Sequence, residues 1–301
     1  MKTTITPQKK LVRSRIINEY VPWILGLPAI LCILICSWQP LIRGIVLSFF
    51  DLTGYDVTGF AGLDNYKAVL GDHLFVKCLV NTFEYLIWSL IIGFIPPIAV
   101  AFMINELMHG KRVFRFITYL PSLVSIVAIA IIWTTVFRPG ENGTANALLV
   151  KLGLPMSKWF EDVRITIPML IFASTWQGMG STALMFFASL QSVNGELYEA
   201  ALIDGAGICR RIWHVTLPRI RGMVLLMFVQ QIIAVFQIMV QPMKMTSGGP
   251  MNESITLCLQ SYYYAFRDFQ IEKSLALGVI TGLILLVLTG FYHVMNKKLS
   301  D

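Results

Sequence analysis

Residues 199–206 read Glu-Ala-Ala-Leu-Ile-Asp-Gly-Ala, and the polar stretch that they open continues to Thr216-Leu217-Pro218. This stretch lies between two uncharged segments, residues 165–195 and 222–243, each long enough for a helix to cross a bilayer. It is compact, charged and rich in alanine and glycine, and small residues let another backbone approach closely. We therefore expect a docking surface between two membrane helices.

The composition is that of a membrane protein. Of the 301 residues, 56% are hydrophobic and 14% are charged, whereas a soluble domain carries roughly 25% charged residues. Six uncharged intervals reach the roughly 20 residues that a helix needs to cross the hydrocarbon, and only helices satisfy every backbone group there. We predict an all-α integral membrane protein with six transmembrane helices, at about residues 20–45, 79–106, 115–137, 165–190, 221–243 and 273–296. The aromatic stretch 254–266 is too short to span, and we expect it at an interface or in a core.

Basic residues gather on one side of these helices. With the N-terminus inside, fourteen of the 24 Lys and Arg residues fall in the inner segments: Lys2, Lys9, Lys10, Arg13, Arg15, Lys111, Arg112, Arg115, Arg210, Arg211, Arg219, Arg221, Lys297 and Lys298. Because positive charge accumulates on the cytoplasmic side, both termini are predicted to be cytoplasmic. The predicted layout is a cytoplasmic arm (1–19), a transmembrane domain (20–296) with a cytoplasmic loop at 191–220, and a cytoplasmic tail (297–301). The first apolar run is too long for a signal peptide, so we expect it to be retained.

The cytoplasmic loop has the pattern of two short helices. Leu197, Tyr198, Ala201, Leu202 and Ile208 fall close to one helical stripe. A glycine at 205 offers a break, and a second apolar pattern then runs to the proline at 218, near the start of the next span. The pattern predicts two helices at an angle around residues 204–205, which dock on a partner. A re-entrant segment or a helix lying on lipid headgroups is the alternative.

The spacing of Glu-Ala-Ala, Asp-Gly-Ala and Thr-Leu-Pro closely resembles the EAA motif of ABC-importer permeases. The chain is similar to binding-protein-dependent sugar permeases of the maltose and glycerol-3-phosphate type, specifically the first of the two permease subunits. Further matches are Gly62-Leu63-Asp64-Asn65-Tyr66, Asn81-Thr82, Leu190-Gln191, Glu196-Leu197-Tyr198 and Thr246-Ser247-Gly248-Gly249-Pro250. Ile212 and Cys209 depart from the usual Phe and Trp of the motif, and the large extra outer domain of the enterobacterial maltose subunit is missing.

The resemblance implies a type I ABC-importer permease fold in the bacterial cytoplasmic (inner) membrane. The implied partners are a second homologous permease, two ATP-binding subunits, an extracytoplasmic solute-binding protein, a sugar substrate and membrane lipid, with no nucleic acid. The implied ATPase-coupling residues are Glu199, Ala200, Ala201, Asp204, Gly205, Ala206, Arg210 and Pro218. The chain has no Walker A sequence, so we expect no ATPase activity of its own, no cofactor and no metal, and ATP and Mg are expected on the partner ATPase.

Polar residues inside the predicted spans mark a candidate substrate pathway, because such groups are costly in lipid unless they face a cavity or a partner. Trp176, Gln177, Ser181, Gln230, Gln231 and Gln237 combine an aromatic face with hydrogen-bonding groups, which suits sugar recognition. Alignment with the maltose permease implies positions Gln177, Gly178, Ser181, Gln231, Ala234, Val235 and Ile238. These glutamines could equally hold helices together. We expect residues 246–250 to form a turn.

Two other function classes remain as alternatives to an importer subunit. A secondary, ion-coupled transporter would need intramembrane Asp, Glu or Arg and often inverted repeats, and the six uncharged intervals contain no such charge. An integral-membrane enzyme would need a catalytic motif, and neither His-Glu-x-x-His nor Gly-x-Ser-x-Gly occurs. Both alternatives are disfavoured by the residues alone. The identity of the sugar is not encoded in any motif of this chain.

Overall fold

The computed structural model describes residues 23, 25–54, 56–107 and 109–300. The arm predicted for residues 1–19 and the last residue of the predicted tail lie outside these ranges. The described part is helical apart from one antiparallel hairpin, so the all-α class is confirmed. The elements are η1 (Leu34–Trp38), α2 (Gln39–Leu47), β1 (Phe50–Thr53), β2 (Asp56–Phe60), α3 (Asp64–Leu70), α4 (His73–Trp88), η2 (Ser89–Phe94), α5 (Ile95–Glu106), α6 (Lys111–Tyr119), η3 (Leu120–Leu123), α7 (Ile126–Val136), α8 (Thr144–Lys151), η4 (Trp159–Glu161), α9 (Thr166–Leu190), α10 (Gly195–Ile203), α11 (Ile208–Arg211), η5 (Ile212–Thr216), α12 (Leu217–Phe236), α13 (Val240–Met245), α14 (Leu257–Phe266) and α15 (Ile271–Ser300).

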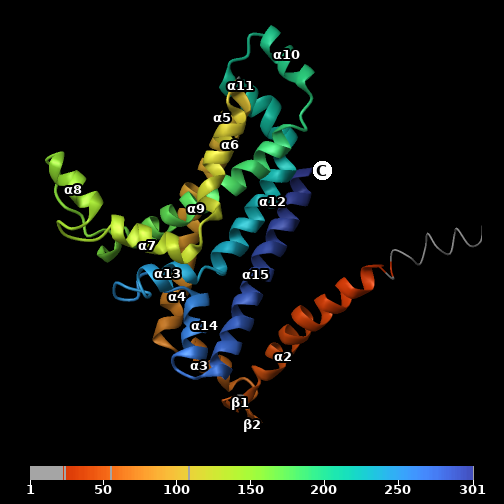
Figure 1. Ribbon diagram of the computed structural model, residues 1–301. Coiled ribbons are helices and arrows are strands. Elements are labelled where there is room, and N and C mark those ends of the chain that lie inside the picture. The colour runs from red at the N-terminus through yellow and green to blue at the C-terminus, as the bar shows by residue number, and fades with distance from the viewer. Residues whose placement is uncertain (1–22, 24, 55, 108, 301) are drawn as a thin grey trace, which may run out of the picture.

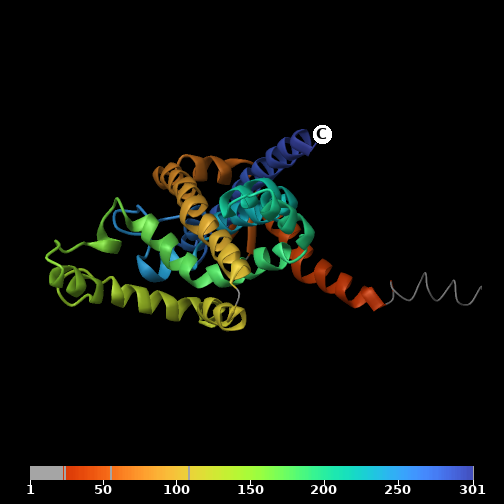
Figure 2. The same ribbon diagram turned by 90° about the horizontal axis from the view of Figure 1, so that it is seen from above.

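Four helices in the described residues are long and apolar enough to cross a membrane: Leu25–Leu47, His73–Glu106, Ile212–Phe236 and Ile271–Val294. A fifth candidate is the pair Lys111–Leu123 and Ile126–Val136, which is bent by 94°. The helix α9 is also long, at 25 residues, but it contains serine, threonine, glutamine and glycine and is not among these candidates. Figures 1 and 2 show α4, α5, α9, α12 and α15 gathered together, while Leu25–Leu47 leans away on one side and α7 and α8 on the other.

A proline pair explains where the helix His73–Glu106 loses regular geometry. Pro96 and Pro97 have no N–H to donate to the carbonyls four residues earlier, and the segment Ser89–Phe94 just before them is π-helical. A proline pair inside an apolar span predicts a bend or a local opening of the helix, and the structure has that opening here. Position 168, inside the span predicted at 165–190, suggests a similar bend, but this prediction is wrong: Pro168 is the third residue of α9, where the N–H groups of a helix have no partner within the helix.

The helix predicted at 221–243 is interrupted in the structure. It ends at Phe236, and only the short α13 follows after a gap. The cause is Pro242, which cannot donate to the Ile238 carbonyl four residues earlier. The Thr256 hydroxyl donates to that carbonyl instead, at 2.7 Å. The interruption is therefore stabilised by a residue of the next helix, which Thr256 also caps by accepting a hydrogen bond from Leu259 N.

The short aromatic segment predicted at 254–266 packs in the core as α14. Leu257 and Leu259 are fully buried in a hydrophobic cluster with residues of α3, α4, α12 and α15. This confirms a core position rather than a membrane span. The helix α14 packs against α15 and α4 and closes one end of the helix bundle (Figure 1).

At this end, buried side chains of α4 bind the backbone that leads into α14. The Asn81 side-chain amide donates to Asn252 O at 2.8 Å and to Ile255 O at 2.9 Å. The Tyr85 hydroxyl donates to Ser254 O at 3.1 Å. Because Ser254 and Ile255 are buried, their carbonyls need partners within the protein, and the side chains of α4 that bind them fix the path of the loop.

The hairpin is tied to the bundle by the two residues that end the 62–66 motif. The Asn65 amide donates to Ser48 O at 3.1 Å and to Phe50 O at 3.0 Å. The Tyr66 hydroxyl shares a 2.6 Å hydrogen bond with the Ser48 hydroxyl. The motif therefore connects the end of the first membrane helix to α3.

We expect Asn81→Leu to destabilise the protein. Leucine has a similar size but no donor, so it would remove the hydrogen bond to the buried Ile255 carbonyl, at a cost of about 1–3 kcal/mol. Thermal unfolding of the detergent-solubilised chain should show a lower melting temperature. Asn142→Ala is the matched control, because Asn142 is exposed; equal melting temperatures for the two variants would contradict the role of Asn81.

Candidate functional site

The loop at 191–220 forms two short helices, α10 and α11, at the end of the molecule opposite the hairpin (Figure 1). The Asn194 side chain caps α10 by accepting from Glu196 N at 3.1 Å. At the other end, Ala206 N donates to Ala201 O at 2.9 Å, and Gly205 N to Leu202 O at 3.0 Å. This is a Schellman motif, which requires a left-handed residue.

Gly205 supplies that left-handed conformation, with φ of 73°. Side chains other than glycine rarely adopt it without strain. The predicted break at residues 204–205 is therefore confirmed, and the glycine has a specific conformational reason. It sets the direction in which the chain leaves α10 for α11.

The side chains at the tip of this loop are largely exposed. Of the predicted coupling residues, Glu199, Ala200, Asp204, Gly205, Arg210 and Pro218 are exposed, and Ala201 and Ala206 are half-buried. Between them lie four large apolar side chains, Leu202, Ile203, Ile208 and Trp213, of which Ile203 is 87% exposed. We call these four residues the apolar tip. Leu202, Ile203 and Ile208 lie outside the candidate spans, and Trp213 is the second residue of the span Ile212–Phe236. Exposed apolar side chains of this kind are typical of a surface that another protein covers.

The base of the loop is fixed to its own chain by contacts that sequence reasoning missed. The Tyr198 and Thr216 hydroxyls share a hydrogen bond of 2.9 Å. The Gln191 amide donates to Asn105 Oδ1 at 2.9 Å, and Arg211 lies 3.8 Å from the Glu106 carboxylate. Because Asn105 and Glu106 end α5, the loop is connected to the second membrane helix as well as to α9 and α12. No local signal marks these pairs, which are distant in the sequence.

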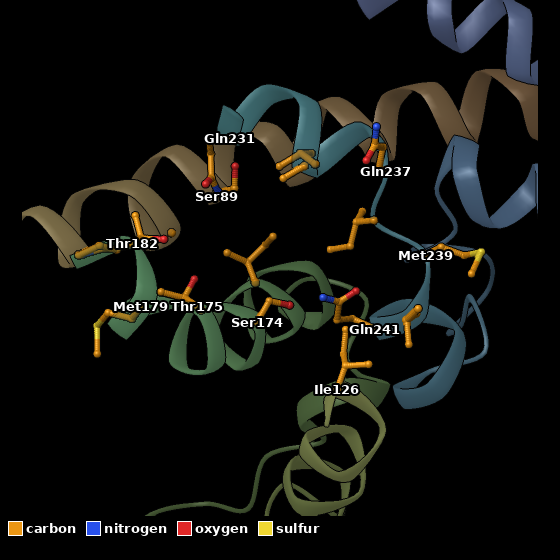
Figure 3. Close-up of a pocket in the computed structure, with 18 residues that line it drawn as sticks. Ser89, Ile126, Ser174, Thr175, Met179, Thr182, Gln231, Gln237, Met239 and Gln241 are labelled. Atoms are coloured by element: carbon orange, nitrogen blue, oxygen red, sulfur yellow. The ribbon is translucent and has the colours of Figure 1, made fainter. Parts of the chain in front are cut away.

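A cavity of about 420 Å³ lies where η2, α9, α12 and α13 meet. Figure 3 shows its labelled polar side chains, which come from different helices and surround one space. The lining residues that carry polar side chains are Ser89, Ser174, Thr175, Thr182, Gln231, Gln237 and Gln241. Gln237 and Gln241 both belong to the segment that follows the end of α12 at Phe236, and both line the cavity.

The structure divides the predicted pathway residues into two groups. Gly178, Gln231, Val235, Gln237 and Ile238 line the cavity, as does Ala234. Trp176, Gln177, Ser181 and Gln230 do not line it. The residues of the first group face the space between the helices and stay candidates for the substrate pathway.

The other residues have structural contacts or face outward. The side-chain amide of Gln177 donates to Val124 O at 2.9 Å, and the backbone carbonyl of Gln177 accepts from the Ser122 hydroxyl at 2.7 Å. It therefore holds the bend between α6 and α7, as the alternative reading of these glutamines proposed. Trp176 packs edge-on against Trp133, with ring centroids 5.5 Å apart.

Five polar side chains of the cavity make no hydrogen bond within the described residues: Thr175, Thr182, Gln231, Gln237 and Gln241. Their donors and acceptors are available to a ligand. Sequence reasoning missed Ser89, Ser174, Thr175, Thr182 and Gln241. Serine and threonine are weak signals because their hydroxyl groups often bind a carbonyl of their own helix, as those of Ser89 and Ser174 do here. For Gln241 the signal was the neighbouring Pro242, which predicts a break in the helix at this point.

The segment 246–250 forms a turn, as expected. Gly249 N donates to Thr246 O at 2.9 Å, and the Thr246 hydroxyl shares a 2.7 Å hydrogen bond with that of Ser254. These contacts join the segment to the loop that α4 holds in place.

Comparisons with known proteins agree with this arrangement. Residues 98–301 match the family described as binding-protein-dependent transport system inner membrane component. The chain is 30% identical to the arabinooligosaccharides transport system permease protein AraP of Halalkalibacterium halodurans, covering 90% of this chain and 86% of that protein. It is 28% identical to the sn-glycerol-3-phosphate transport system permease protein UgpA of Escherichia coli O157:H7, covering 93% and 96%. A chain of a bacterial alginate ABC transporter, solved in complex with an alginate pentasaccharide-bound periplasmic protein, shares the fold with a TM-score of 0.83 at 24% identity, covering 96% and 98%.

Proposed function

Because this chain belongs to the family of binding-protein-dependent transport system inner membrane components, we propose that it is a permease subunit of an ATP-driven importer of a sugar or sugar derivative. The observation that carries the proposal is the exposed loop α10–α11 with its apolar tip, in a chain that lacks a nucleotide-binding motif. A motor on another polypeptide needs such a surface. The names of relatives at 28–30% identity support the sugar class.

The proposed topology has six membrane spans with both termini in the cytoplasm. It counts the four long apolar helices, the bent pair α6–α7 as one span, and α9. The positive charge on the segments beside α10–α11 supports a cytoplasmic position for this loop. The proposed location is the bacterial cytoplasmic (inner) membrane, with residues 20–296 as the permease domain.

The proposed partners are a second homologous permease, two ATP-binding subunits that hold ATP and Mg, and an extracytoplasmic solute-binding protein. The related alginate transporter was solved with its periplasmic protein, which supports the last of these. The coupling surface would consist of the predicted residues from Glu199 to Pro218 together with the apolar tip. The contacts of Asn105 and Glu106 with the loop would carry its movement to α5 as well.

The substrate would pass along the cavity between η2, α9 and α12. Its hydrogen-bonding groups without protein partners suit a molecule with many hydroxyl groups. Closure of the ATPases would then move α9 and α12 through the loop that joins them, which would open and close the cavity to the two sides of the membrane in turn.

The test is uptake by the whole importer in cells that carry it, with and without an inactivated ATPase partner. We expect sugar uptake to disappear when the ATPase is inactive and to persist when a protonophore collapses the ion gradient but ATP is maintained. Uptake that survives loss of the ATPase and collapses with the gradient would instead show a secondary transporter. A product that differs chemically from the sugar supplied would point to a membrane enzyme.

A further inference from the structure

The wall of the cavity carries no charge. Its eighteen lining residues are serine, threonine, glutamine, glycine, proline, methionine and aliphatic residues, with no acid, base or aromatic ring. Every polar group on the wall is therefore a neutral donor or acceptor. A ligand bound there is recognised by hydrogen bonds to hydroxyl and amide groups alone.

The absence of charge is informative because the names of the relatives include both neutral and charged substrates. One is named for arabino-oligosaccharides, which are neutral, and another for glycerol 3-phosphate, which is an anion. An ion that leaves water for a partly enclosed site loses hydration, at a cost of several kcal/mol unless an opposite charge compensates. The cavity of this chain offers no such compensation. A neutral molecule with hydroxyl groups loses much less.

Gly93 gives this wall a small notch. A Cβ atom built on Gly93 would lie 2.9 Å from the Gln231 side-chain nitrogen, 3.4 Å from the Thr175 hydroxyl and 3.7 Å from Ser89 Cβ. The backbone of η2 thus approaches the amide of Gln231 as closely as a residue without a side chain allows. The polar groups of Gln231 and Thr175 lie beside this notch. Neither side chain has a hydrogen-bond partner among the described residues, so both are available to a ligand.

We propose that this cavity selects an uncharged saccharide, with the Gln231 amide and the Thr175 hydroxyl beside Gly93 binding its hydroxyl groups, and that it discriminates against uronates and sugar phosphates. The proposal rests on the proposed function and names the substrate class for the same site. Gly93 is a specificity-determining residue in it, because a side chain there would displace the Gln231 amide.

The experiment compares neutral with charged probes and includes one pair, galactobiose and digalacturonate, that is matched except for the carboxylates. Cells carrying the complete importer are given radiolabelled neutral saccharides (arabinobiose, cellobiose, maltose, galactobiose), digalacturonate as the charged counterpart of galactobiose, and glycerol 3-phosphate. We expect ATP-dependent uptake of at least one neutral probe, and uptake of the anions at least about tenfold lower. ATP-dependent uptake of an anion at the neutral rate would overturn the charge selection while the importer function stands. A lack of ATP-dependent uptake of every probe would overturn both.

Variants at one position test whether this wall sets the selection. Gln241→Lys adds a cation to the cavity, and we expect it to raise the ratio of digalacturonate to galactobiose uptake by about tenfold, the effect of 1.4 kcal/mol. Gln241→Glu places the opposite charge at the same position and should lower that ratio. An unchanged ratio in both variants, with normal amounts of the importer in the membrane, would contradict the proposal.

The notch is tested separately by Gly93→Ala. We expect uptake of the neutral substrate to fall about tenfold, mainly through a higher KM, because the Gln231 amide must move away. Gly222→Ala is the control, since it lies on the same helix as Gln231, is outside the cavity and meets nothing within 4 Å. Copurification of the ATPase confirms assembly of each variant. Equal KM values for Gly93→Ala and Gly222→Ala would show that the notch does not bind the substrate.

Discussion

Uptake should fall by about 10- to 100-fold when Gly205 is replaced by valine. Valine is β-branched and would have to adopt φ of 73° to keep the turn, at a cost on the order of 1–3 kcal/mol. The turn would rearrange instead, and the two hydrogen bonds that end α10 would be lost. The apolar tip would then point in another direction, so a partner that closes on it could no longer pull on α9 and α12.

The measurement is ATP-dependent uptake together with the amount of ATPase that copurifies with the permease. Gly205→Asn is the matched control, because asparagine tolerates the left-handed conformation better than other residues. We expect this variant to keep most of the activity. Equal activity of the valine and asparagine variants would mean that the backbone conformation at this position does not limit coupling.

The largest effect on stability is expected from Gly180→Ala. Gly180 is buried where α9 crosses α6, and a Cβ atom there would lie 2.1 Å from Thr118 O and 2.7 Å from Tyr119 Cα. Both neighbours are backbone atoms, so no side-chain rotation can relieve the overlap. The helices must separate, and overpacking of this kind costs about 1–3 kcal/mol, sometimes more.

Thermal unfolding of the purified protein measures this effect. Gly178→Ala is the control for stability, because it lies on the same helix two residues earlier and its new methyl group would meet nothing within 4 Å. We expect a clear fall in melting temperature for Gly180→Ala and little change for Gly178→Ala. If both variants melt at the same temperature, the close crossing of α9 and α6 is not a stabilising contact.

The structure of the loop at 191–220 was predictable because it depends on neighbours in the sequence. The cap of α10 uses Asn194, the turn uses Gly205, and the hydrogen bonds that end the helix join residues at most five apart. Periodicity and one glycine were therefore enough to predict two helices and the break between them. Its attachment to Asn105 was not predictable, since that contact joins residues 86 apart in the chain.

The cavity was only partly predictable, because polarity does not say which way a residue faces. Gln177 and Gln231 both lie in apolar helices, yet the first binds the Val124 carbonyl and the second faces the cavity without a partner. The difference depends on how each helix is rotated in the bundle. Ser89 and Thr175 were missed for the same reason, since such residues also occur in helices that face lipid.

The sequence by itself determined that this is a helical membrane protein, roughly where its spans lie, and which loop carries the coupling motif. Length, apolarity and positive charge are properties of continuous segments, and a bilayer imposes its requirements segment by segment. Tertiary structure decided where the fifth predicted helix breaks and which polar groups share a cavity. Pro242 frees the Ile238 carbonyl, but the break persists because Thr256 from another helix donates to it. That hydrogen bond exists only once the helices have packed, and the same packing turns Gln231 toward Gly93.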